Sequence, residues 1–267
     1  MTESDLGIDS VVGNGVLRIT INRPQRRNSL DRDATHRMVE LIDAAPSDES
    51  VRAIVITGAG DHFCPGADLT SANERGDRRP RIGHLERALA AGAHRLIQTI
   101  WETQLPVIAG VRGVAAGLGC NLALVCDYVV AARSASFWYP FAARGFTPDS
   151  GSTFLLPRLV GTARAKQILM LGRQIDGATA FEWGMVTELV DDGDLGAAVD
   201  RIAAEFAAGA TVAVGLTKWA VNHALELDLA HAMHQEAMVE ELAIRSPDFK
   251  EGIAAFHDKR PPNYTGR

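Results

Sequence analysis

Two glycine-bearing segments of the sequence hold the residue types best suited to chemistry on a carbonyl group. The first is FCPGADL, residues 63–69, and the second is GVAAGLGCN, residues 113–121. Each follows a strand-like run and leads into a helical pattern, where glycine lets the backbone approach a ligand. Two N–H groups that converge on one point form an oxyanion hole, which stabilises negative charge developing on a carbonyl oxygen. When each segment is considered alone, tight packing explains its glycines better than an oxyanion hole does.

The elements that must position these segments alternate between strand and helix patterns. Strand-like apolar runs span residues 16–21, 51–57, 106–111 and 128–132. Amphipathic helical patterns span residues 34–45 and 85–100, and Asp31 and Asp33 suit the first turn of the former. This alternation predicts an α/β core.

From about Thr162 onward the pattern is almost wholly helical. Helices are predicted around residue 165, after Asp176 as a capping residue, and over residues 195–206, 212–227 and 229–244. A last helix should begin at Ser246, because proline at residue 247 suits the first helical position. We therefore divide the chain into an α/β core, residues 1–205, and a helical segment, residues 206–267, whose apolar faces are expected to pack on other subunits.

Composition limits the classes of function. The 267 residues are 46% hydrophobic and 22% charged, which argues against disorder, and the net charge of −6 disfavours nucleic acid as a general partner. Local arginines and lysines still suffice for phosphate groups. No run approaches the roughly 18 apolar residues of a membrane helix, and the polar N-terminus is unlike a signal peptide. We expect a cytoplasmic protein with no membrane partner, and its three cysteines as small buried thiols.

Taken together with other motifs, the glycine segments resemble those of the crotonase (enoyl-CoA hydratase/isomerase) family. The resemblance covers nearly the whole chain, and the motifs stand in the order of the family. The matching segments are RPQRRNSL at 23–30, FCPGADL at 63–69, GVAAGLGCNLALVCD at 113–127, TPDSGST at 147–153 with LPRLVG at 156–161, and FHDKRPP at 256–262.

The resemblance implies a fold, a substrate class and an assembly. The fold would be a crotonase-like spiral of ββα units followed by a C-terminal helical trimerisation segment, giving a homotrimer or a dimer of trimers. The substrate would be an acyl-CoA thioester, and no cofactor or metal would be needed beyond the CoA of the substrate itself.

Site residues follow from the same resemblance. The oxyanion donors would be the backbone N–H groups of Ala67 and Leu118. Phe256 and Lys259 would reach the CoA of a neighbouring subunit. We expect Asp68 to accept backbone N–H bonds near a helix start rather than to act as an acid. The full set of expected CoA-binding residues is Gln25, Arg26, Pro65, Asp68, Leu69, Phe256 and Lys259.

The carboxylates decide which reaction the resemblance favours. Hydratases of the family use two glutamates, and this sequence has Asn121 and Phe141 at those positions, where we expect both to line the acyl pocket. Asp149 stands where related single-acid isomerases carry their acid. One carboxylate suffices to move a proton from the α-carbon to the γ-carbon of a 3-enoyl thioester. Judged locally, Asp149 also fits a turn-forming residue after Pro148.

Alternative readings remain. One is an enoyl-CoA hydratase of β-oxidation, and another is a non-catalytic acyl-CoA- or RNA-binding homologue, for which the arginines of residues 75–81 would be the best feature. A short-chain dehydrogenase is excluded, since alanines stand where a lysine should follow Tyr128 or Tyr139. His231 and His234 lack a third metal ligand, so we expect no metal.

Overall fold

The computed structural model describes residues 6–68 and 81–267 and contains a large, mostly parallel sheet. Its strand order is β1-β2-β3-β4-β6-β9, in which β1 and β2 are antiparallel and every other neighbouring pair is parallel. The bounds are β1 Ile8–Gly13, β2 Val16–Ile21, β3 Ala53–Gly58, β4 Val107–Val111, β6 Tyr128–Ala132 and β9 Glu188–Val190.

A second, smaller sheet carries the second glycine segment. It is formed by β5 Val114–Ala116, β7 Ser136–Trp138 and β8 Gln174–Asp176, in the order β5-β7-β8. An isolated bridge joins Cys64 to Ala115, and another joins Leu30 to Ala67. The first glycine segment thus pairs with β5, which is part of the second glycine segment and forms an edge of the second sheet.

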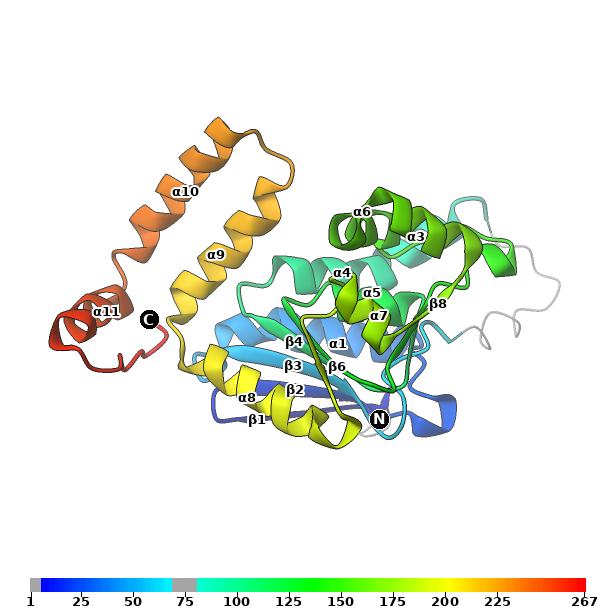
Figure 1. The fold of residues 1–267 in the computed structure, drawn as a ribbon, viewed down its shortest axis with the longest axis horizontal. Coiled ribbons are helices and arrows are strands. Elements are labelled where there is room, and N and C mark those ends of the chain that lie inside the picture. The colour runs from blue at the N-terminus through cyan, green and yellow to red at the C-terminus, as the bar shows by residue number, and fades with distance from the viewer. Residues whose placement is uncertain (1–5, 69–80) are drawn as a thin grey trace.

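Helices cover the large sheet on both faces (Figure 1). α1 Arg32–Ala44 and α4 Ala93–Glu102 pack on one face, within an apolar core that also takes in α5 Leu118–Leu124 and the second sheet. α8 Leu195–Ala208 lies on the other face and buries a separate apolar cluster against β2, β3, β4 and β6. The remaining helices of this region are α3 His84–Ala91, α6 Ser152–Leu171 and α7 Gly177–Glu182, with 3-10 turns η2 Pro24–Arg26, η3 Ala45–Ser47, η4 Ala142–Arg144 and η5 Asp192–Asp194.

The C-terminal helices form an arm that projects from the core (Figure 1). They are α9 Thr211–Ala224, α10 Leu229–Ala243 and α11 Pro247–Asp258. Lys218 anchors α9, since its ammonium group donates to the carbonyls of Ile100 and Leu105 and pairs with Asp127 at 2.8 Å. Buried Asp248 accepts the N–H groups of residues 265 and 266, which ties the end of the chain to α11.

The α/β class and crotonase-like fold predicted from the sequence are confirmed, with differences in detail. The helix predicted over 85–100 is broken at Gly92 into α3 and α4. α8 runs to Ala208, past the helix end predicted at residue 206. Asp31, Asp176 and Ser246 each accept a backbone N–H bond at a helix start. No helix in the described part of the chain combines the length and apolar character needed to cross a bilayer.

Candidate active site

Backbone hydrogen bonds fix the first glycine segment on both sides. Cys64 N donates to Val114 O at 3.0 Å, and Ala116 N donates to Cys64 O at 2.9 Å. On the other side Leu30 exchanges bonds with the main chain at Gly66 (2.9 Å) and at residue 68 (2.8 Å). Ala67 lies between these anchors, and its own N–H has no acceptor among the described residues. The donor is therefore held in place and left for a ligand.

Close packing brings the second segment against the first. Gly66 has φ 102°, and a Cβ placed there would lie 2.8 Å from Ala116 O and 3.5 Å from Leu118 N. A Cβ at Gly119 would lie only 1.9 Å from Cys64 O, so no larger residue fits. Leu118 opens α5, and within residues 6–68 and 81–267 its N–H also lacks an acceptor. Two unpaired N–H donors thus stand on backbones in direct contact.

One pocket joins these donors to the proposed acid. It has a volume of about 80 Å³, and its walls include Pro65, Ala67, Leu118, Phe141 and Asp149. A neighbouring cavity of about 490 Å³ shares Ala67 and Leu118 with it and contains Asp68. Residues from four separate stretches of the sequence therefore meet at one place, as an oxyanion hole beside a carboxylate requires.

Asp149 sits in a tight turn at the start of α6, half-buried. Its Oδ1 accepts a bond from the Ser150 hydroxyl at 2.9 Å, and its Oδ2 has no partner in the described part of the chain. Ser150 has φ 51° and Gly151 has φ 85°, both in the left-handed region that disfavours side chains. The carboxylate is oriented on one oxygen and left open on the other, which suits a group that exchanges a proton with a substrate.

Asn121 lies behind the pocket rather than on its wall, which differs from the position expected from the sequence. It is fully buried, and its Nδ2 donates to the carbonyl of Asp149 at 3.1 Å and to the Ser152 hydroxyl at 2.8 Å. The Tyr139 hydroxyl donates to Asn121 Oδ1 at 3.1 Å. All of these bonds are internal, so the amide faces the protein and not the cavity.

Phe141 does line the pocket. Its ring lies 6.2 Å from that of Tyr139 and 5.3 Å, edge on, from that of Phe146. Only 4% of Phe141 is exposed. The second hydratase position is therefore part of an aromatic wall that offers no proton-transfer group.

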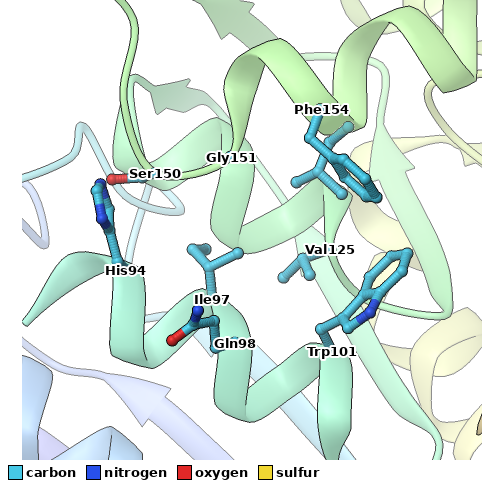
Figure 2. Close-up of a pocket in the computed structure, with 9 residues that line it drawn as sticks. His94, Ile97, Gln98, Trp101, Val125, Ser150, Gly151 and Phe154 are labelled. Carbon is cyan, nitrogen blue, oxygen red and sulfur yellow. The ribbon is translucent and has the colours of Figure 1, made fainter. Parts of the chain in front are cut away.

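A further apolar cavity opens beside the Asp149 turn (Figure 2). It has a volume of about 350 Å³ and lies between α4 and the start of α6. Trp101 and Phe154 meet edge to face at 5.5 Å in its wall, with Ile97 beside them. Ser150 lines both this cavity and the pocket of Asp149. The apolar cavity and the pocket of Asp149 therefore adjoin each other at Ser150.

The residues of the core that are expected to bind CoA lie in two places, one on the pocket wall and one on the exposed surface. Pro65 lines the pocket, whereas Gln25 and Arg26 are exposed on η2. Arg26 Nη1 donates to Asp68 Oδ2 at 2.7 Å, and Arg23 lies 3.9 Å from the same oxygen. The Asp68 carboxylate thus pairs with guanidinium groups, and the backbone after Asp68, where the sequence suggests a helix start, lies outside the described residues. Leu69 lies outside the described residues.

Phe256 and Lys259 are not brought to the pocket of their own chain. Phe256 is 80% exposed on α11, and Lys259 is exposed at the end of that helix. Figure 1 shows α11 at the opposite end of the molecule from α3, which borders the cavity containing Asp68. A role for either residue in CoA binding therefore requires another copy of the chain.

Buried thiols and a histidine of α10 are further reactive groups among the described residues. Burial raises the pKa of the Cys64 thiol to about 12 and also raises the pKa of Cys120, so neither is a ready nucleophile. His231 bonds Asp228 at the start of α10. Among residues 6–68 and 81–267 no cluster of three or more His, Cys, Asp or Glu is arranged for a metal ion.

Sequence reasoning missed several residues around the acid. Ser150 and Ser152 bond Asp149 directly, and Tyr139 acts through Asn121. The only local signal was the polar run that follows Pro148, because serine beside aspartate is also typical of turns. Arg144 lines the pocket as well, with its guanidinium 5.5 Å from the Trp138 ring, and nothing in the sequence singled it out.

Comparison with known proteins identifies a family and several relatives. Residues 12–267 match the family described as enoyl-CoA hydratase/isomerase. The chain is 38% identical over 258 residues to 1,2-epoxyphenylacetyl-CoA isomerase of Escherichia coli, covering 97% of this chain and 98% of that one. It is 36% identical over 249 residues to crotonyl-CoA hydratase of Syntrophomonas wolfei, covering 92% and 93%. The crystal structure of an enoyl-CoA hydratase from Bacillus anthracis superimposes with a TM-score of 0.90 at 31% identity, over 98% of this chain and 100% of that one.

The fold and a sequence match of this extent define the class. The chain belongs to the enoyl-CoA hydratase/isomerase family, within the crotonase superfamily, and is an acyl-CoA enzyme.

Proposed function

We propose that this enzyme is an enoyl-CoA double-bond isomerase that uses Asp149 as its one acid–base group. The observation that carries the proposal is the composition of the pocket wall. Asp149 shares that wall with the oxyanion candidates Ala67 and Leu118, while Phe141 stands at one hydratase position and internally bonded Asn121 at the other. With no carboxylate at either hydratase position, water activation lacks its pair of acids.

The proposed reaction needs only one proton carrier. The thioester oxygen accepts bonds from the N–H groups of Ala67 and Leu118, which stabilise the dienolate as Asp149 removes a proton from the α-carbon. The C–H electron pair moves into the dienolate, and the γ-carbon then takes the proton back from the Asp149 carboxyl group. The double bond has moved from C3 to C2, and no water has been added.

The acyl group beyond the reacting carbons has an apolar space available. The cavity of about 350 Å³ beside Ser150, with Trp101 and Phe154 in its wall, matches a ring or a branched chain in character. A relative named for a ring-type thioester, 1,2-epoxyphenylacetyl-CoA, supports including such substrates.

Hydratase activity is the second candidate. Crotonyl-CoA hydratase of Syntrophomonas wolfei is a relative over 92% of this chain. An oxyanion hole would also stabilise the enolate that forms when water adds to a 2-enoyl thioester. A hydratase would need a further carboxylate near the pocket. A non-catalytic acyl-CoA- or RNA-binding role has less support. Of the four arginines on which the RNA hypothesis rested, Arg75, Arg78 and Arg79 lie outside the described residues, and Arg81 is exposed.

The CoA moiety and the assembly belong to the same proposal. We place the CoA nucleotide near Gln25, Arg26 and Pro65, and we propose that Phe256 and Lys259 come from a neighbouring subunit in a trimer or a dimer of trimers. The position of α11 at the far end of the chain supports contact between subunits (Figure 1).

A panel of CoA thioesters tests the function. Straight-chain 3-enoyl, ring-type 3-enoyl and 2-enoyl substrates are offered to one enzyme preparation, and products are identified by mass, since hydration adds one water and isomerisation adds nothing. We expect isomerisation to exceed hydration by a wide margin. Fast hydration of 2-enoyl-CoA would favour the second candidate.

A further inference from the structure

Asn121 is a fully buried polar side chain to which the proposed reaction gives no role. It lies on α5, and its hydrogen bonds reach Tyr139, the residue after β7, and the turn before α6. Burying an amide costs free energy unless its donors and acceptor are satisfied, and here both ends are bonded. The bonds meet at the main chain of Asp149, the proposed acid.

The carbonyl oxygen of Asp149 accepts bonds from three donors. They are Asn121 Nδ2 at 3.1 Å, Ser152 Oγ at 2.7 Å and Ser152 N at 3.0 Å. The Tyr139 hydroxyl, at 3.1 Å from Asn121 Oδ1, sets which end of the amide faces Asp149. With the amide turned over, an oxygen would oppose the Asp149 carbonyl and the bond would be lost.

The turn held by these bonds is one that the chain does not adopt without support. Ser150 is buried at φ 51°, and Gly151 follows at φ 85°. Left-handed backbone at a residue with a side chain costs free energy and persists only where surrounding contacts determine it. Because Ser150 also bonds the Asp149 carboxylate at 2.9 Å, a relaxed turn would move both the carboxylate and its partner.

We propose that Asn121 is a positioning residue. Through the Asp149 carbonyl it holds the turn of residues 149–151 in the conformation that directs the carboxylate into the pocket, and Tyr139 fixes the orientation of its amide. This role rests on the proposed function of Asp149. It also carries a consequence for the reaction type, because an ionised glutamate at this position has no N–H to donate to the carbonyl. Residue 121 therefore cannot both supply a carboxylate for hydration and donate the hydrogen bond that supports this turn.

The substitution Asn121→Asp tests the role with little change in shape. It replaces the Nδ2 donor by an acceptor, and we expect kcat for isomerisation to fall about 10- to 100-fold through misplacement of the carboxylate. KM should stay nearly unchanged, because no substrate contact is removed. Tyr139→Phe should cause a smaller loss in kcat. If Asn121→Asp does not fold, Ser152→Ala removes a hydroxyl from the same carbonyl and carries the same expectation.

Cys126→Ala is the matched control. It deletes a buried bond, from Sγ to Leu122 O at 3.2 Å, just beyond the end of the same helix and away from Asp149. We expect a lower Tm with kcat unchanged, and all rates are measured well below the Tm of each variant. Equal losses of kcat in Cys126→Ala and Asn121→Asp would overturn the positioning role, because general loosening of α5 would then explain both.

A double-mutant cycle separates this role from the function on which it rests. If Asn121 acts through Asp149, adding Asn121→Asp to Asp149→Asn causes no further loss of kcat. A full additional loss would overturn the positioning role. The positioning role would also be overturned if Asn121→Asp kept the wild-type kcat while Asp149→Asn was inactive. In that case the proposed function would stand. Full activity of Asp149→Asn would instead overturn the proposed function, and the positioning role with it.

Discussion

The region around Asp149 and the C-terminal arm differ in how many of their side chains find partners within the same chain. At the acid, the carbonyl of Asp149 has three donors, and the amide of Asn121 is bonded at both ends. On α9 to α11, large apolar side chains remain exposed, including Leu229 at 76% and Phe256 at 80%. The hydrogen bonds that hold the Asp149 turn are thus formed within one chain, whereas the arm presents apolar surface of the kind that subunit interfaces cover.

This difference separates chemistry from assembly. The proton transfer should depend on a few residues of the core, and single changes there should alter kcat. The arm should act through subunit contacts, and changes there should alter molecular mass and the affinity for CoA. Lys218, bonded to two carbonyls and to Asp127, is one of the residues that hold α9 to the core, together with Asn222, which donates to the carbonyl of Trp101.

The largest effect is expected from Asp149→Asn. The substitution keeps size and most hydrogen bonding but removes the base, and loss of a general acid–base group costs about 100- to 10,000-fold in rate. We expect that loss in kcat for 3-enoyl-CoA isomerisation, with KM and CoA affinity little changed, measured by steady-state kinetics. Near-full activity would reduce Asp149 to a turn residue.

The next effect concerns the oxyanion hole. Leu118 is the first residue of α5, a position that tolerates proline, so Leu118→Pro should delete one donor without breaking the helix. Removing one such donor lowers kcat about 100- to 1,000-fold. Leu118→Ala is the control, since it removes the same side chain and keeps the N–H. Similar kcat values for the two variants would show that the N–H of Leu118 takes no part.

Assembly should respond to changes in the arm. Met233 and Leu242 are exposed apolar residues of α10, and glutamate at both would place charge in a subunit interface. By light scattering we expect a trimer, or a multiple of it, for the wild type and smaller species for the double variant. Val11→Glu, an equally exposed apolar residue of β1, is the control. A wild-type protein that is a stable, active monomer would contradict both the interface and the shared CoA site.

The smallest effects are expected at the CoA phosphates. Arg26 and Lys259 are exposed, and ion pairs of exposed side chains contribute little, so each change to alanine should raise KM by about 2- to 5-fold. Free CoA should bind more weakly as salt rises. Asp33→Ala, an exposed charge change on α1, serves as control. Unchanged CoA affinity in both Arg26→Ala and Lys259→Ala would place the phosphates elsewhere.

The sequence predicted elements with strong periodicity and missed those whose stability comes from distant partners. β6 at 128–132 and the capping residue Asp176 were predicted correctly, because apolar runs and caps are local signals. Asp31 was expected in the first turn of α1 and is the N-cap just before it. β1 was missed, since only Ile8 of its residues is buried. β5, β7, β8 and β9 span three residues each, too short for a visible period.

The site residues also divide into those that motifs could locate and those whose position depends on distant partners. Motifs located Ala67, Leu118 and Asp149, and the structure brings all three to one pocket. The position of Asn121 was not predictable, because its partners lie 18 to 31 residues further along the chain and meet it only after folding. An asparagine that faces a cavity and one that braces a turn look alike in a sequence.

Proton transfer at the α-carbon tests the central claim most directly. A 3-enoyl-CoA is dissolved in D₂O with wild-type enzyme or with Asp149→Asn, at concentrations that give equal occupancy, and proton NMR follows the α-protons and the double bond. We expect the wild type to remove an α-proton and shift the double bond, and Asp149→Asn to do both at least about 100-fold more slowly. Exchange of the α-protons at the wild-type rate by Asp149→Asn would contradict the assignment of Asp149 as the base.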